Sequence, residues 1–456
     1  MPELRPTVIL RMGSHSEKEY IEKTLKHFDG LMVGANLLQI SPGATASLLL
    51  KLHKACKRPY FVDPMTYAFG SYFDPETGRV RDDLDWIKSE QKVPGKKGIT
   101  ERKFKVSYRK LANYFGEPFS TALDRGKALT QADFPNDHVV DEACRTIIKF
   151  QAERLREVFK EDPQTAVYAN DLPRPGAVFA PYFYIEPNRA KHWLSLNNRL
   201  ALSTTQQSKD IPVHVVVCGH MDLLTNAEHS ALVVNNLLAC KPAGVWLWFS
   251  RFDERGANKE QLLALRWWVE KLTNVMSVFN MHGGFFSLAL SKFGMAGTMH
   301  GVGYGEQKDV VPVIGQSTPT VQYYLRALHS KYSVLQIQRC FTQLGIRTPE
   351  DFFLKICECA ICKHIVGAGL NEFSQFGEIR YSTPKPKRAA QTPAAAKRCR
   401  YHFLLNRILE RDYVEKSSLA EIADQCRTSA DIWSKTVIGS ASAHAKLWAE
   451  VLNSNL

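Results

Sequence analysis

Three cysteines lie within six residues of this chain, in the stretch CECAICKH at residues 357–364. The thiolates of Cys357, Cys359 and Cys362 would repel one another at this spacing, and a disulfide between such close neighbours would be strained. A bound Zn²⁺ ion removes both problems, because it takes four tetrahedral ligands drawn from Cys and His. In a reducing compartment such a cluster favours metal over a disulfide. The stretch therefore predicts a structural zinc site.

The fourth ligand of that site has to be a later Cys or His on an element that folds back. We expect it to be His402, which opens the helical stretch YHFLLNRILE. Cys399 is the main alternative. His364 is a weaker one, because it follows too closely on Cys362. The alternative to a metal site is a set of reduced surface thiols without metal.

Eight short apolar or β-branched runs recur along the chain, and several of them are separated by amphipathic helical stretches. Their residue ranges are 6–13, 30–38, 59–67, 178–187, 212–222, 244–254, 274–284 and 296–306. This alternation predicts an α/β fold, a (β/α)8 TIM barrel, over residues 1–320. A doubly wound open sheet is the second possibility, because parallel strands are apolar on both faces in either architecture.

Two further regions depart from the alternating pattern. Residues 70–175 exceed what one connection needs and are expected to form a charged and helical insertion in the barrel. Residues 321–456 read as a helical, zinc-binding C-terminal extension. Within it, residues 381–400 are rich in Pro, Ala and basic residues and predict a flexible linker.

Polar residues end several of the predicted strands. In a (β/α)8 barrel the reactive groups lie at the carboxyl ends of the strands. Asp63 is the best placed, because it ends an apolar strand and Pro64 fixes the exit of the chain. The complete set of such residues is Asp63, Glu186, His220, Asp222, Asp253, His282 and the segment from His300 to Glu306.

The segments MHGG at 281–284 and MHGVGYGE at 299–306 close neighbouring strands. Gly283 and Gly284 would let backbone N–H groups approach an anion or a flat base, and His282 and His300 would donate to a phosphate or a purine edge. The alternative is two tight turns whose histidines bond to backbone carbonyls. Together with His220, the same histidines also permit an open metal site of a hydrolase.

The Cys-x-Cys-x-x-Cys cluster, followed by a His at the head of a helix and preceded by an eight-strand barrel, resembles the tRNA-guanine transglycosylase superfamily. The stretch FVDPMTYAF resembles the Asp-Ser-Gly-Gly-Phe/Tyr segment of that family. The resemblance implies that Asp63 handles proton chemistry at the base and that Tyr67 stacks on it. MHGG is similar to a glycine-rich strand end of the family.

The resemblance implies an enzyme that exchanges guanine for a 7-deazaguanine in tRNA, or in DNA for relatives in phage and bacterial defence systems. Its partners would be nucleic acid, a purine or 7-deazaguanine base, and a second copy or other proteins of a modification system. The family nucleophile, an Asp at the end of strand eight, has no counterpart near Met299 or His300. The motif expected at strand six is also replaced, by LWFSRFDE.

A second carboxylate could instead come from Asp253 or Glu306. Asp253 is equally compatible with a salt bridge to Arg251 or Arg255, and Glu306 with a solvent-facing loop. The barrel would then exchange a base, only hydrolyse the glycosidic bond, or bind a nucleobase or nucleic acid without chemistry inside a larger assembly.

Composition adds three expectations. The formal net charge of +13 favours a polyanionic partner, because Lys and Arg displace phosphate counterions. Aromatic residues near the predicted strand ends, namely Tyr67, Phe69, Phe252 and Tyr304, suit base stacking, and core packing is the more common explanation for any one of them. No apolar run reaches the ~18–20 residues of a membrane span and the start lacks a signal-peptide pattern, so we expect a cytoplasmic protein without membrane contact.

Overall fold

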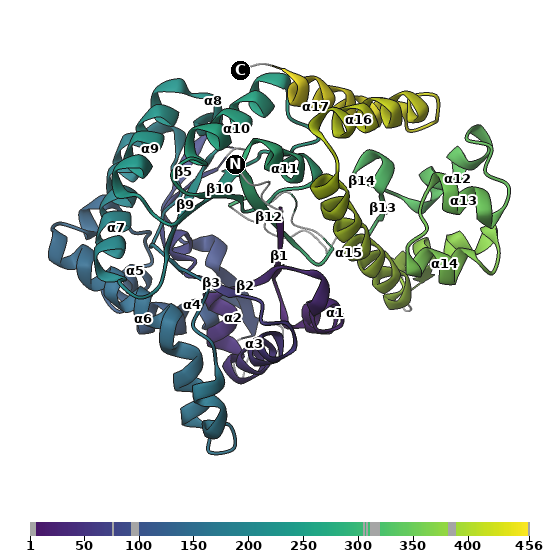
Figure 1. Ribbon diagram of the computed structural model, residues 1–456. Coiled ribbons are helices and arrows are strands. Elements are labelled where there is room, and N and C mark those ends of the chain that lie inside the picture. The colour runs from purple at the N-terminus through teal and green to yellow at the C-terminus, as the bar shows by residue number, and fades with distance from the viewer. Residues whose placement is uncertain are drawn as a thin grey trace.

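Eight parallel strands form one sheet in the computed structural model, which describes residues 6–74, 77–92, 100–303, 306, 309–310, 320–381 and 389–454 (Figure 1). The sheet order is β3-β2-β1-β12-β11-β10-β9-β8. The N–H of Gly176, just before β8, donates to the carbonyl of Tyr60 on β3 at 2.8 Å, so the two edges of the sheet meet. The result is a nearly closed barrel of the TIM type.

The eight strands coincide in position with the eight runs predicted from the sequence. They are β1 Thr7–Met12, β2 Gly30–Gly34, β3 Tyr60–Asp63, β8 Val178–Phe179, β9 Val213–His220, β10 Gly244–Ser250, β11 Ser277–Asn280 and β12 Met295–Gly301. The shortest, β8, ends well before the predicted residue 187. Pro181 follows it and has no N–H to give to the ladder, and pairing resumes only as a bridge between Ile185 and Gly219.

Helices cover the outside of the barrel between the strands (Figure 1). They are α1 Lys18–Thr24, α2 Ala35–Ile40, α3 Pro42–Cys56, α7 Ala190–Gln207, α8 Asp222–Thr225, α9 Ala227–Cys240, α10 Lys259–Leu272 and α11 Phe285–Ala289. α10 shows why they begin where they do. The Asn258 side chain accepts the N–H of Gln261 at 2.9 Å, and the Gln261 side chain accepts the N–H of Asn258, which satisfies two otherwise unpaired donors.

The described part of the insertion after β3 contains two hairpins and three α-helices. Its elements are β4 Tyr72–Asp74, β5 Arg79–Arg81, β6 Lys88–Lys92, β7 Thr100–Phe104, α4 Val106–Phe115, α5 Phe119–Arg125 and α6 Asp137–Glu161. β4 pairs with β5 and β6 with β7, both antiparallel. Hydrophobic side chains of α4, α5 and α6 belong to the same core as those of the barrel strands, so the insertion packs onto the barrel.

The chain after the barrel contains two short hairpins and six helices among its described residues. They are β13 Tyr323–Leu325, β14 Ser330–Tyr332, α12 Val334–Gln343, α13 Pro349–Lys355, α14 Ala360–Val366, β15 Ile379–Tyr381, β16 Ala389–Gln391, α15 Pro393–Lys416, α16 Leu419–Trp433 and α17 Ala443–Asn453. No described helix is both long enough and apolar enough to cross a membrane.

The predicted linker at 381–400 differs from the structure in its second half. Residues 389–391 are the strand β16, and α15 starts at Pro393, where the Thr392 side chain accepts the N–H of Ala395 at 3.1 Å. Proline is favoured at the first position of a helix, and the alanines that follow have the highest helix propensity. Residues 382–388 of the predicted linker lie outside the described residues.

Two hydrophobic cores hold the molecule together. The larger one joins the barrel to α15, α16 and α17, through residues such as Phe403 and Trp448. The smaller one lies mainly between residues 321 and 376 and includes all three clustered cysteines. α15 therefore connects the two cores, and Figure 1 shows it between the barrel and the helices α12–α14.

Candidate functional site

Aromatic side chains fill the inside of the barrel below its carboxyl-terminal mouth. The rings of Trp246 and Phe279 stack with centroids 4.6 Å apart, and Phe61 contacts Trp246 at 5.7 Å. Side chains two residues apart on a strand share one face. Asp63 and Trp248 therefore also point inward, one layer closer to the mouth.

Asp63 is buried at the end of β3, with 1% of its surface exposed. Its Oδ1 accepts the N–H of Met65 at 2.9 Å and the hydroxyl of Tyr182 at 2.8 Å. Its Oδ2 has no hydrogen-bond partner among the described residues. A buried carboxylate oxygen without a partner is costly, so this atom singles out Asp63 as a candidate functional residue.

Aromatic rings enclose Asp63. Tyr67 stacks on Tyr182 with centroids 5.5 Å apart and meets the edge of Trp248 at 5.0 Å. His282 in turn lies 5.0 Å from Trp248. Burial raises the pKa of Tyr182 well above its ordinary value, and Asp63 raises it further. The Tyr182 hydroxyl therefore keeps its proton and remains a donor to Asp63.

Arg11, on β1, contributes a cation to the same region. Burial raises the pKa values of Tyr67 and Tyr108, and the positive charge of Arg11 partly opposes both shifts. The Nε of Arg11 is buried without a hydrogen-bond partner among the described residues. One carboxylate oxygen and one guanidinium N–H in this region are thus both buried without a hydrogen-bond partner among the described residues.

The other predicted binding residues occupy different environments. Phe69 packs between Phe119 and Tyr108 of the insertion, with centroids 5.5 and 6.1 Å away. The Nδ1 of His220 lies 3.1 Å from Asp222 Oδ2. Tyr304 lies outside the described residues.

His300 faces outward from the barrel. Its ring contacts Phe28 and, on α15, Phe403, and its Nδ1 bonds to the carbonyl of Gly301 at 2.8 Å. Burial lowers its pKa to about 3, so it is neutral at physiological pH. The structure does not bring His220, His282 and His300 together as metal ligands. Among the described residues, the one cluster of His, Cys, Asp or Glu side chains that could hold a metal ion is the cysteine cluster with His402.

The loop at Gly283 and Gly284 is fixed by hydrogen bonds to the carboxylate of Glu254. The N–H of Gly284 donates to Glu254 Oε1 at 2.9 Å, and the N–H of Phe286 donates to Oε2 at 3.2 Å. A side chain on Gly283 would collide with Thr298 Oγ1 and Ser287 Oγ, so only glycine fits. Burial raises the pKa of Glu254 to about 7, although Ser287 and the N–H of Gly284 oppose that shift.

The two proposed second carboxylates are both in ion pairs. Asp253 pairs with Arg255 Nε at 3.2 Å, which is the salt bridge that the sequence left open. Glu306 is not solvent-facing: it accepts from Lys331 Nζ at 2.7 Å and from the fully buried Arg407. The Nη1 of Arg407 also lies 3.0 Å from Oε2 of Glu410 on the same helix. This network attaches α15 to the barrel.

Glu306 is therefore expected to stabilise the fold. Replacing it should lower the free energy of unfolding by an amount that depends on pH. Burial alone would raise its pKa, but Lys331 and Arg407 lower it to about 2. A lowered pKa stabilises the folded state above about pH 4.5, and this contribution disappears as the pH falls towards 2. Glu306→Gln should lower the free energy of unfolding at pH 7 by about 3 kcal/mol and flatten the acid limb.

Urea unfolding at pH 7, 4.5 and 3 measures this effect. Asp253→Asn is the matched control, because its partly exposed ion pair is worth about 0–1 kcal/mol. Equal losses in the two variants, or an unchanged acid limb in Glu306→Gln, would contradict the assignment.

The cysteine cluster and His402 come together in the smaller core. All four are buried, and the three sulfurs and His402 Nδ1 lie within 4.8 Å of one another. The distances from His402 Nδ1 to the sulfurs of Cys357, Cys359 and Cys362 are 3.9, 3.3 and 3.4 Å. The four residues can hold one metal ion, as predicted.

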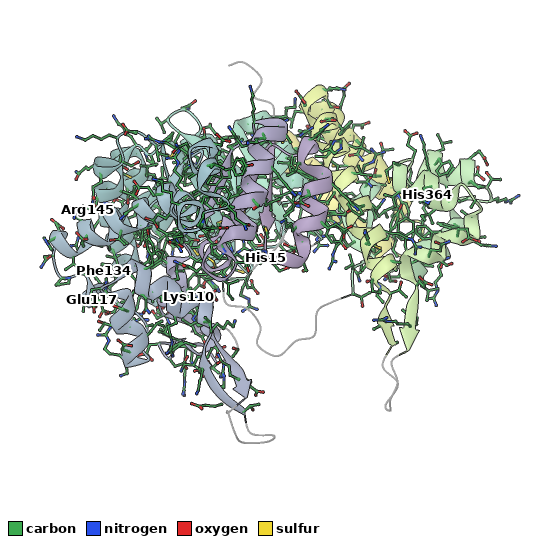
Figure 2. All side chains as sticks on the ribbon, turned by 90° about the horizontal axis from the view of Figure 1, so that it is seen from below. His15, Lys110, Glu117, Phe134, Arg145 and His364 are labelled. Atoms are coloured by element: carbon green, nitrogen blue, oxygen red, sulfur yellow. The ribbon has the colours of Figure 1, made fainter. Side chains whose placement is uncertain are left out.

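Neighbouring groups fix the ligands of this cluster. His402 Nε2 lies 2.7 Å from the carbonyl of Tyr324, and the ring of Tyr323 stacks on the imidazole at 4.0 Å. The carbonyl contact leaves Nδ1 to face the sulfurs, as second-shell partners of metal sites do. The two alternative ligands are not in the cluster. Cys399 bonds to the carbonyl of Phe376 at 3.3 Å, and His364 is exposed on α14 (Figure 2).

Several residues of the mouth were missed in the sequence, namely Arg11, Tyr182, Trp248 and Glu254. Tyr182 and Trp248 stand in apolar runs, where packing explains them equally well. Trp248 carried one signal, since it shares the strand face of Trp246. Glu254 stood beside Asp253, and only the turn after β10 decides which of the two binds the start of α11.

Fold and site together define a class of protein: an α/β barrel of the TIM type with a buried aspartate at its mouth and a Cys3His cluster in a helical extension. No model of a known protein family matches the chain, and no curated protein matches it in sequence.

Proposed function

We propose that this protein is a zinc-containing nucleobase transglycosylase that exchanges or releases guanine or a 7-deazaguanine in tRNA or DNA. The observation that supports this most is Asp63, a buried carboxylate with one free oxygen, enclosed by Tyr67, Tyr182 and Trp248 at the mouth of the barrel. A flat base fits such an aromatic enclosure by stacking. A base in a duplex has to leave its stack to reach it.

The chemistry is assigned to Asp63. In the reacting form the Asp63 carboxyl carries a proton on Oδ2 and gives it to the leaving base as the bond from the base nitrogen to the anomeric carbon breaks. The bonding electrons leave with the base, and Asp63 becomes a carboxylate. The sugar passes through an oxocarbenium-like state. The incoming base then bonds to the anomeric carbon and returns its proton to Asp63. With water in place of a base, the same site releases the base by hydrolysis. Asp253 and Glu306 are held in ion pairs and receive no step.

Zinc is proposed as the metal of the Cys3His cluster. A tetrahedral Zn²⁺ with Zn–S of about 2.3 Å and Zn–N of about 2.0 Å places ligand atoms roughly 3.5–3.8 Å apart, close to the 3.3–3.9 Å between His402 Nδ1 and the three sulfurs. Four protein ligands leave no open position, so the metal would be structural. It would tie α14 to α15.

The test of this function is incorporation of radiolabelled guanine or 7-deazaguanine into tRNA and into duplex DNA, with release of free base measured in the same reactions. Incorporation or release that depends on the protein supports the proposal. If the protein neither incorporates nor releases a base in either nucleic acid, the proposal is wrong.

A catalytically silent barrel that binds a base or nucleic acid in a larger assembly is the second candidate. The ion pairs of Asp253 and Glu306 favour it, because they leave Asp63 as the one carboxylate to which we assign chemistry. Retained binding of nucleic acid without incorporation or release would select this function.

A further inference from the structure

A cavity of about 280 Å³ lies in the C-terminal extension, between the turn that joins β13 to β14 and the helices α13, α15 and α16. The described residues that line it include neither Asp63 nor a member of the Cys3His cluster. Pockets for small organic molecules measure about 300–1,000 Å³. This cavity is at the lower end of that range, so it suits a small molecule.

Apolar side chains from two helices line this cavity. Phe353 and Leu354 belong to α13, Ile356 follows that helix directly, and Leu409 belongs to α15. Leu354 is 84% exposed and Leu409 is 37% exposed. Covering these side chains with an apolar group removes apolar surface from water, which is favourable. The cavity therefore favours a ligand with an apolar body.

A buried ion pair forms another part of the lining. His329 Nδ1 lies 2.5 Å from Glu410 Oε1, and the Tyr324 hydroxyl donates to the same oxygen at 2.7 Å. The other oxygen of Glu410 lies 3.0 Å from Arg407 Nη1. Burial alone would raise the pKa of Glu410, but Arg407 and His329 hold that pKa below its usual range. The carboxylate is therefore ionised, and its charge is balanced within the protein.

The backbone of His329 is in the left-handed region, with φ at +48°. Residues other than glycine rarely adopt this conformation, and here it places the imidazole flat on the ring of Phe285, with centroids 3.4 Å apart. His329 Nε2 lies 3.4 Å from Oε1 of Gln425, which also lines the cavity. These contacts fix the polar side of the cavity before a ligand arrives, which lowers the entropic cost of binding.

Arg326 carries the positive charge of the lining that has no acidic partner nearby. It is half-buried and forms no ion pair with another described residue. The second cation, Lys355, donates to the carbonyls of Leu344 and Gly345 at 2.8 and 3.2 Å. A guanidinium matches a carboxylate in shape and binds it through two parallel hydrogen bonds. Arg326 therefore favours an anionic group on the ligand.

We propose that this cavity binds a small organic monoanion, namely a carboxylate with an apolar body. The carboxylate binds Arg326, and the body covers Leu354 and Leu409. A second negative charge is disfavoured, because Glu410 is already ionised in the lining. This site goes beyond the proposed function and does not depend on it, since none of these residues is assigned a step in base exchange.

The test measures binding of benzoate, indole-3-acetate and octanoate to the full chain by calorimetry and by saturation-transfer NMR, each beside its uncharged amide. Arg326→Gln removes the cation, and Ser429→Phe on α16 fills the cavity. The matched controls are Arg339→Gln, an exposed arginine of α12 outside the lining, and Thr428→Phe, the exposed neighbour of Ser429.

At least one carboxylate should bind about tenfold or more tightly than its amide, the usual gain from hydrogen bonds to a charged group. Arg326→Gln should remove this preference and weaken binding of the carboxylate about tenfold. Ser429→Phe should weaken carboxylate and amide alike, about tenfold or more. Each control should stay within about twofold of the unmodified protein.

Thermal unfolding shows whether each variant is folded. If Ser429→Phe is unfolded, Leu354→Ser at an exposed position takes its place, and it should weaken carboxylate and amide equally, by about threefold. The proposal is wrong if none of the three carboxylates binds, if each amide binds as tightly as its carboxylate, or if Arg326→Gln behaves like Arg339→Gln. Any of these results leaves base exchange at Asp63 unaffected, because the test measures no activity.

Discussion

Asp63→Asn is expected to reduce base exchange by about 10²–10⁴-fold, the usual contribution of a positioned general acid or base. The asparagine oxygen can still accept from the N–H of Met65 and the hydroxyl of Tyr182, which bind Asp63 Oδ1 at 2.9 and 2.8 Å. The amide cannot give a proton to a leaving base or take one back. The change therefore removes the proton transfer and keeps the local structure.

The measurement is the rate of labelled-base incorporation under single-turnover conditions, together with nucleic-acid affinity and thermal unfolding. Affinity and unfolding should stay close to those of the unmodified protein. Asp253→Asn is the control, because Asp253 pairs with Arg255 and has no assigned step, and it should keep exchange within about threefold. An Asp63→Asn protein that exchanges bases at the original rate would exclude Asp63 from the chemistry.

Loss of the metal is expected to have the largest effect on stability. The purified protein should contain one zinc per chain, and Cys359→Ser or His402→Ala should lose it. Structural zinc contributes up to about 10–16 kcal/mol of apparent binding free energy in small domains. The cluster lies inside the smaller core, so its loss should lower the unfolding temperature of that part by about 10 °C or more.

Metal content by elemental analysis, calorimetry and limited proteolysis of residues 321–381 measure this effect. Cys399→Ser is a sharp control: Cys399 is buried one helical turn before His402, but its sulfur bonds to the carbonyl of Phe376. This variant should keep its zinc. A native protein without metal, or a Cys399→Ser variant that loses it, would refute the Cys357, Cys359, Cys362 and His402 ligand set.

The positions of the eight strands were readable in the sequence because parallel strands are covered on both faces and therefore appear as short apolar runs. Their ends were less readable. β8 stops at Phe179 instead of 187, because Pro181 interrupts the ladder, and α15 begins at Pro393 inside the predicted linker. Pro181 ends a strand, whereas Pro393 begins a helix. The residue type alone does not say which of these a proline does, and the neighbouring strand or helix decides.

The sequence by itself determined the three cysteines of the cluster, since three thiols at such close spacing have few stable arrangements, and it favoured His402 as the fourth ligand over Cys399 and His364. Only the structure decided between these three residues. The sequence also singled out Asp63, because a strand that ends in Asp-Pro places the carboxylate at the mouth of a barrel. What only the tertiary structure decided is which neighbours these residues have. The pairing of Glu306 with Lys331 and Arg407, the outward direction of His300 and the enclosure of Asp63 by Tyr182 and Trp248 all join segments far apart in the chain. Such contacts depend on barrel closure and on the docking of α15, which no local pattern records.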